Sequence, residues 1–253
     1  MQRRNIIRLM AAISTTVVIG SAAYWQYRMQ PLTTVKVHET TVPTIFIGGD
    51  YAKAFSTNGF VHRLSETNLM TKALVVHVGK RGQVNIQQVA PLRYNPTIQV
   101  IYADNHHPTL QAHQLVKVMS ILKQRYHVTR YDAVGHSSGG NIIFDYLTQT
   151  PQAQQPKIHK FVTLGSNYPD ATAAIKKLPP KLPVLNIAGQ LWDTSGDGTV
   201  TLKSVLAFSQ QLRHDAFQPQ THVIHGGLLT ATHSMLHINP LVDREIVSFL
   251  YGR

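Results

Sequence analysis

One short stretch combines residue types at a spacing that can turn a serine hydroxyl into a nucleophile: Gly135-His136-Ser137-Ser138-Gly139-Gly140. It fits the pattern G-x-S-x-G, in which a serine occupies a sharp turn between a strand and a helix. An apolar stretch at 131–134 precedes it, and residues 141–147, with helical spacing, follow it. The flanking glycines leave room for a tight turn, and a helix N-terminus favours negative charge. This context favours an activated Ser137 over the alternative, an ordinary Gly- and Ser-rich loop.

The base that would take the serine proton is predicted to be His233. A nucleophilic serine needs such a base, and the base needs a carboxylate that holds its tautomer. His233 lies in the loop between the last predicted strand and the last predicted helix, whereas His225 ends that strand itself. His233 and His237 are four residues apart and could instead share a helical face as metal ligands. Since no acidic residue or third histidine accompanies them at a suitable spacing, we expect neither a metal nor a cofactor.

The carboxylate is predicted to be Asp197. Asp193 and Asp197 both lie in the loop that follows the predicted strand 184–189. Asp197 stands beside Gly198 and just before a predicted helix, where backbone N–H groups can fix a carboxylate. Asp193 is the second candidate. The loop could alternatively bind calcium through both acids and backbone carbonyls, but two acids are few for such a site.

A second Gly-rich turn could complete the site. The buried strand predicted at 44–47 ends in Gly48-Gly49-Asp50. We expect the backbone N–H of Asp50, or of a neighbour, to stabilise an oxyanion together with the N–H of Ser138. A simple strand-ending turn is the alternative.

The elements that must position these residues alternate between strand and helix along most of the chain. Apolar runs predict further strands at 72–78, 84–89, 97–102, 161–166 and 221–225, and apolar stripes predict helices at 55–64, 109–126, 200–212 and 240–250. This alternation predicts an α/β fold with a mostly parallel central sheet and helices on both faces. The irregular segment 167–183 contains Pro and Lys, and we expect it to form a small cap over the site.

The N-terminus carries the pattern of an export signal. Three arginines precede a run without charge from Leu9 to Trp25, and Arg28 follows it. Residues 1–30 are therefore predicted to be a signal peptide, with Ser21-Ala22-Ala23 available for cleavage, or a membrane anchor, which we slightly favour. Residues 31–40 are predicted to be a polar linker, and 41–253 the domain. We expect the domain to be exported, either to the extracellular face of the membrane or as a secreted protein.

Composition narrows the choice of partners. Hydrophobic residues make up 43% of the chain, charged residues 14%, and cysteine is absent, which excludes disulfides and a cysteine nucleophile. The net charge is +12. The Lys and Arg residues are scattered, with no basic run interleaved with aromatics, so an anionic surface such as an envelope polymer or lipid headgroups is favoured over nucleic acid.

These segments together resemble the α/β-hydrolase superfamily. Within it, the chain is similar from about 41 to 251 to the membrane-bound cell surface hydrolases of Gram-positive bacteria, a family of largely unassigned substrate. The similar segments are the elbow, Asn95-Pro96 with the strand after it, Asp197-Gly198-x-Val200, and His233-Ser234-x-Leu236. The resemblance implies a catalytic triad of Ser137, Asp197 and His233. The chain departs at Gly48-Gly49, where lipase-like members usually carry His-Gly.

The expected activity is that of a serine hydrolase, a carboxylesterase or lipase-like enzyme, that acts on a small-molecule or lipid-like acyl substrate. A peptidase, amidase or acyltransferase could use the same triad. A protein of another class, which binds anionic surfaces on a hydrolase scaffold without catalysis, is the third hypothesis. The fold alone does not choose among them, but a binding protein has no need for a serine, an acid and a base in this order.

Overall fold

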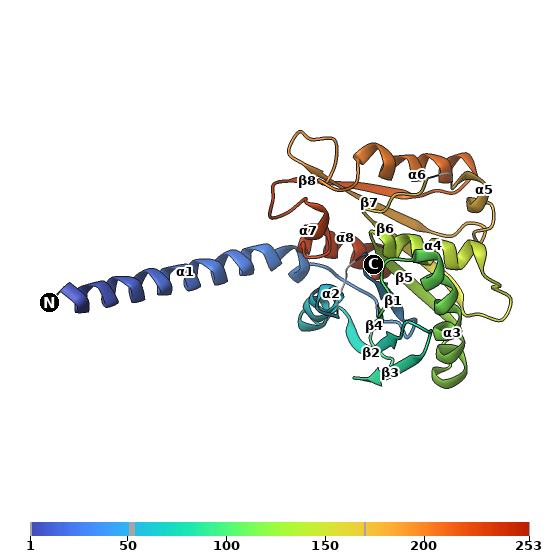
Figure 1. The fold of residues 1–253 in the computed structure, drawn as a ribbon, viewed down its shortest axis with the longest axis horizontal. Helices are drawn as coiled ribbons and strands as arrows, with labels where there is room; N and C mark the ends of the chain where they lie inside the picture. Colours follow the sequence, from blue (N-terminus) through green and yellow to red (C-terminus); the bar gives the residue numbers. More distant parts are fainter. Residues whose placement is uncertain (1, 51–53, 170, 253) are drawn as a thin grey trace.

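A computed structural model of the protein describes residues 2–50, 54–169 and 171–252, and Figure 1 shows its fold. The described residues form an eight-stranded sheet in the order β3-β2-β4-β1-β5-β6-β7-β8. Only β2 and β3 pair antiparallel; the other neighbours pair parallel. The strands are β1 (Thr44–Ile47), β2 (Thr71–Val78), β3 (Val84–Gln88), β4 (Pro96–Tyr102), β5 (Arg130–His136), β6 (Lys157–Leu164), β7 (Val184–Leu191) and β8 (Gln220–Gly226).

Helices cover both faces of this sheet, as predicted (Figure 1). One apolar core lies beneath α3, α4, α5 and α6, and the other beneath α2, α7, α8 and the end of α1. The helices are α1 (Gln2–Thr33), α2 (Ala54–Glu66), α3 (Pro108–Tyr126), α4 (Ser138–Gln149), α5 (Thr172–Ile175), α6 (Leu202–His214), α7 (His233–Leu236) and α8 (Pro240–Tyr251).

The sequence pattern explains why these elements form. The four residues of β1 are all buried, because a central parallel strand is covered on both faces, and three of them, Ile45, Phe46 and Ile47, are apolar. In α3 the buried side chains recur at helical spacing, and Pro108 begins the helix where its missing N–H costs nothing. The edge strand β3 is polar at alternate positions, as expected for a strand that faces solvent.

The segment 167–183 is not a cap over the site, so that expectation is corrected. Its apolar side chains are buried in the core that α3, α4 and α6 also cover. Tyr168 stacks on Phe208 of α6 at 3.9 Å between ring centroids. Proline and lysine residues interrupt the spacing of these apolar side chains, so the sequence shows no periodic pattern that would predict their burial. The buried residues are Tyr168, Ala171, Ile175, Leu178 and Leu182.

The N-terminal helix α1 projects from the domain, and its C-terminal end is docked on it (Figure 1). Its stretch Asn5–Thr33 is long and apolar enough to cross a membrane. Leu32 is buried beside α8, and the backbone N–H of His38 donates to Tyr251 at 2.9 Å. The polar segment predicted as a linker, 31–40, therefore includes the last helical turn and a stretch that contacts α8.

Candidate active site

Ser137 lies at the junction of β5 and α4, in the sharp turn that the glycine pattern predicts. Its backbone has φ 56° and ψ −129°, a conformation that residues other than glycine rarely adopt and that costs about 1–3 kcal/mol. A Cβ atom at Gly135 would lie 2.5 Å from the backbone of Gly139 and Gly140. Ser166 steadies the turn, because its hydroxyl donates to the carbonyl oxygen of Ser137 at 2.7 Å. This sharp turn therefore places the Ser137 side chain at the carboxyl end of β5.

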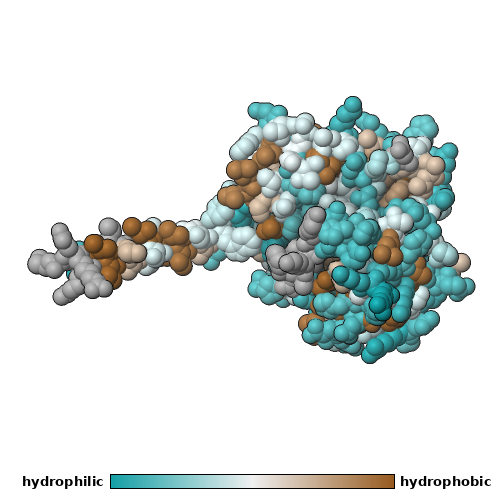
Figure 2. All heavy atoms as spheres, viewed as in Figure 1, coloured by the Kyte–Doolittle hydropathy of each residue, from teal (hydrophilic) through white to brown (hydrophobic). Residues whose placement is uncertain are grey.

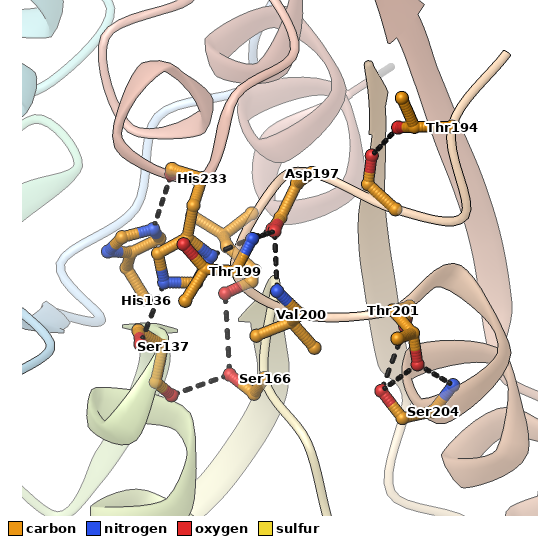
Figure 3. Close-up of polar contacts among 12 residues, drawn as sticks. His136, Ser137, Ser166, Thr194, Asp197, Thr199, Val200, Thr201, Ser204 and His233 are labelled. Carbon is orange, nitrogen blue, oxygen red and sulfur yellow. Dashed lines mark hydrogen bonds and ion pairs between the residues drawn. The ribbon is translucent and has the colours of Figure 1, made fainter. Parts of the chain in front are cut away.

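His233 lies within hydrogen-bond reach of this serine, as Figure 3 shows. Its Nε2 atom is 2.9 Å from the Oγ atom of Ser137. His233 is the first residue of α7, and its backbone N–H donates to the carbonyl oxygen of Asp197 at 2.9 Å. The loop after β8 and the loop after β7 therefore meet beside the elbow.

The Asp197 carboxylate completes a chain of hydrogen bonds from the β7–α6 loop to the elbow (Figure 3). Its Oδ2 lies 2.7 Å from Nδ1 of His233, and its Oδ1 accepts the backbone N–H groups of Thr199 and Val200 at 2.9 and 2.7 Å. Burial opposes the charged form, but the bonds from His233 and the two N–H groups outweigh it and lower the pKa of Asp197. The carboxylate therefore stays charged at neutral pH.

The other sequence candidates lie elsewhere. Asp193 is exposed, and His225 at the end of β8 is exposed too. Both Asp197 oxygens are engaged by N–H donors, so the alternative of a calcium site on Asp193 and Asp197 has no support in this geometry. Within residues 2–50, 54–169 and 171–252, no group of three or more His, Cys, Asp or Glu side chains could hold a metal ion.

Two further histidines lie beside the site, and the sequence predicted neither contact: His136 contacts His233, and His237 contacts His136. The Nε2 atom of His136 donates to the carbonyl oxygen of His233 at 2.9 Å, since a carbonyl can only accept. The His136 ring lies 4.8 Å from the His233 ring and 4.6 Å from the His237 ring. Burial and the neighbouring imidazoles hold the pKa of His136 well below its ordinary value, and burial with the Arg63 charge lowers the pKa of His237 to about 4. Both side chains are therefore neutral at neutral pH.

The Gly48-Gly49-Asp50 turn lies directly against the elbow. A Cβ atom at Gly49 would come within 2.5 Å of the Ser137 Cβ, so only glycine fits at this position. The hydroxyl of Ser138 donates to the Asp50 carboxylate at 2.7 Å and ties the two turns together. The backbone N–H of Ser138, in the first turn of α4, has no partner within the helix. Both predicted oxyanion residues are thus neighbours of Ser137, while residues 51–53 lie outside the described residues.

A cavity of about 270 Å³ opens beside Ser137. It is small for a ligand site, since drug-sized ligands occupy roughly 300–1,000 Å³. Part of its wall is formed by buried apolar side chains, which belong to Phe46, Ile47, Phe60, Val134 and Leu164. The remaining lining residues are Gly48, Gly49, Asp50, His136, Ser137, His233, Ser234 and His237. The space suits an apolar group attached to a carbonyl at Ser137.

The parallel sheet and the strained elbow define the molecule as an α/β hydrolase. A profile of the family described as "Alpha/beta hydrolase of unknown function (DUF915)" matches residues 32–176 and 171–253, so the chain belongs to this family. The fold and the resemblance predicted from the sequence are thereby confirmed. A comparison with curated proteins finds no match to the chain.

Solved structures agree with this assignment. The product of gene lin2722 from Listeria innocua is 26% identical, with a TM-score of 0.74 over 83% of this chain and 93% of that one. A protein from Lactobacillus plantarum WCFS1, described as a cell surface hydrolase, is 24% identical, with a TM-score of 0.65 over 83% and 89% of the two chains. Esterase PE8 has the same fold at 13% identity, with a TM-score of 0.54 over 85% and 97%.

Proposed function

We propose that the protein is a serine hydrolase that cleaves a carboxylic ester through an acyl-enzyme. The observation that carries the proposal is the continuous hydrogen-bond path from Asp197 through His233 to Ser137. A serine, an imidazole and a charged carboxylate in this sequence of contacts are what acyl transfer by a serine requires.

In the proposed reaction, Nε2 of His233 takes the proton of the Ser137 hydroxyl while Oγ attacks the ester carbonyl carbon. The charged Asp197 keeps the proton on Nδ1 and stabilises the imidazolium that forms. The N–H groups of Ser138 and Asp50 stabilise the oxyanion. The alcohol leaves with the proton from His233, and a water molecule, activated by the same base, then releases the acid and frees Ser137.

The cavity supports an acyl group of modest size as the part of the substrate nearest the serine. Its buried apolar wall would hold a hydrocarbon chain, and its volume is below the usual range for drug-sized ligands. Hydrolysis of p-nitrophenyl esters with acyl chains of increasing length, compared with the matching anilides, separates an esterase from an amidase or peptidase. We expect the esters to be cleaved and the matching anilides not to be.

We further propose that the domain works outside the cell membrane, held there by α1. The support is the apolar stretch Asn5–Thr33, with Arg3 and Arg4 before it and Arg8 near its start, which favour a cytoplasmic N-terminus. The net charge of +12 would also favour contact with an anionic envelope polymer. Quenching of Trp25 emission by lipids brominated in their acyl chains, in reconstituted vesicles, tests the insertion of α1.

The proposed chemistry is tested by labelling the purified full chain with a fluorophosphonate probe, which reacts with activated serines. We expect wild type to be labelled, and Ser137→Ala and His233→Ala to lose the label. Ser248→Ala is the matched control, because Ser248 is an exposed serine on α8. Absence of labelling in a folded wild type, or persistent labelling of Ser137→Ala, would reject the proposal.

A further inference from the structure

Three large apolar side chains are exposed on the loops that carry the site. Trp192 follows β7 and is 59% exposed, while Leu228 and Leu229 follow β8 and are 58% and 63% exposed. The two loops are joined, because the backbone N–H of Trp192 donates to the Gly226 carbonyl at 2.8 Å. We call these three residues the interfacial patch. Single exposed apolar residues are common, so what covers this patch must be argued from its surroundings.

The helix α1 has the features of a segment that ends at a membrane surface. Arg8 and Arg28 are 20 positions apart with no charge between them. At 1.5 Å per residue the span is about 30 Å, the thickness of a hydrocarbon core. Tyr24, Trp25 and Tyr27 stand just before Arg28 with exposed fractions of 46%, 43% and 67%. Such aromatic residues favour the boundary between lipid and water, so Arg28 marks that boundary on the side of the domain.

Hydrogen bonds from Arg28 fix the position of the interfacial patch relative to the end of the apolar stretch of α1. Its Nη1 atom donates to the Leu229 carbonyl oxygen at 3.0 Å, and its Nη2 atom donates to Oδ1 of Asn239 at 3.0 Å. Asn239 in turn donates to the Thr230 carbonyl at 2.8 Å. The leucine loop is thus held at the depth of Arg28. In Figure 1 the two loops lie on the side from which α1 projects, and Figure 2 shows hydrophobic surface there, next to the base of the helix.

We propose that the interfacial patch contacts the outer leaflet of the membrane that α1 spans, and that the site takes carboxylic esters of lipids from that same leaflet. The leucine loop ends four residues beyond Leu229, at His233, so an inserted loop sets the site next to the bilayer. The substrate part of this inference rests on the proposed serine hydrolase chemistry. The contact with lipid does not depend on that chemistry.

The protein has two tryptophans, Trp25 and Trp192, which makes the contact measurable. The full chain with Trp25→Phe, reconstituted in vesicles of phosphatidylglycerol and phosphatidylcholine, reports on Trp192 alone. We expect lipids brominated in their acyl chains to quench its emission, and Leu228→Ser with Leu229→Ser to reduce that quenching. The reverse variant, Trp192→Phe, reports on Trp25 and shows whether α1 is inserted. An unquenched Trp192 overturns the proposal, whether Trp25 is quenched or not.

Measurements of lipid-ester hydrolysis and of serine labelling separate this inference from the proposed function. With a fluorogenic phosphatidylglycerol ester in the vesicles, we expect the double serine variant to lose at least about tenfold in rate, since the loss of even one inserted leucine accounts for that factor. Labelling of Ser137 by a water-soluble fluorophosphonate should be unchanged in that variant. Absence of lipid-ester hydrolysis by a wild type that is labelled overturns the substrate inference, and equal hydrolysis by both proteins overturns the role of the patch in it. Absence of labelling in wild type overturns the serine chemistry while leaving the quenching result to stand.

Discussion

At the scale of single residues, Asp197 and Asp193 carry the same carboxylate but differ in exposure and in hydrogen bonding. Asp197 is 2% exposed and receives hydrogen bonds on both oxygens, whereas Asp193 points into solvent four residues earlier. In the proposed reaction, the Asp197 carboxylate holds a proton on Nδ1 of His233, which leaves Nε2 free to accept the proton of Ser137. The two acids therefore form a matched pair for experiment.

We expect Asp197→Asn to lower kcat by about 10⁴, because an asparagine amide can hold the wrong tautomer of His233. Asp193→Asn should leave kcat near that of wild type, since this side chain touches none of the reacting groups. Steady-state hydrolysis of a soluble ester by both variants measures the difference. Similar losses in the two variants would contradict the assignment of Asp197.

Sequence reasoning selected Ser137, Asp197 and His233 because each lies in the turn or loop after a predicted strand, and parallel strands bring such loops to one edge of the sheet. The contacts of His136 and Ser166 have no such signal. His136 meets the backbone of a residue 97 positions away, and Ser166 bonds the elbow from the end of another strand. The sequence places His136 within the elbow, but its contact with the His233 carbonyl depends on how two loops that are distant in sequence fold together.

At the scale of elements, the short helix α7 ends at a partly buried histidine that resists protonation. His237 closes α7, and burial together with the charge of Arg63 lowers its pKa to about 4, from an ordinary value near 6.5. Between these two pH values the unfolded chain binds a proton that the folded chain excludes. Stability from this group is therefore complete above pH 6.5 and is lost as the pH falls toward 4.

We expect the free energy of unfolding to fall by about 2–3 kcal/mol between pH 7 and pH 4 through His237 alone. His237→Gln lacks this titration, so its stability should decline less, and the gap between variant and wild type should narrow in acid. Urea unfolding at pH 7 and pH 4.5 measures both. His225→Gln, at an exposed histidine, should follow wild type; a His237→Gln curve parallel to wild type would contradict the expectation.

Most helices and strands could be predicted, because a buried strand and an amphipathic helix each have a recognisable pattern of apolar residues within a short stretch of sequence. The cap prediction was wrong for a physical reason. Tyr168, Ile175 and Leu178 are anchored in the core at irregular spacing, between prolines and lysines that suggest a surface loop. The docking of residues 31–40 was likewise invisible, because Leu32 and Val37 contact α8, which lies at the other end of the chain.

At the scale of the whole molecule, the net charge of +12 acts at long range and does not depend on the site. If it attracts an anionic polymer, that attraction is screened by salt, since the Debye length falls from about 10 Å at 0.1 M to about 3 Å at 1 M. The full chain should therefore bind dextran sulfate at low salt and release it as salt rises. Neutral dextran is the control, and equal or salt-independent binding to both polymers would contradict an electrostatic contact.

The hydrogen bond between Arg28 and the Leu229 carbonyl also limits how the domain can move relative to α1. A domain on a flexible tether searches a volume, with an effective concentration set by the tether length. Here the helix end is fixed to the domain, so a molecule anchored through α1 keeps one face toward the bilayer and would meet the proposed lipid substrate by diffusion in a plane. Its turnover would then scale with the number of substrate molecules per area of membrane, and diluting the substrate with inert lipid would slow it even at constant bulk concentration.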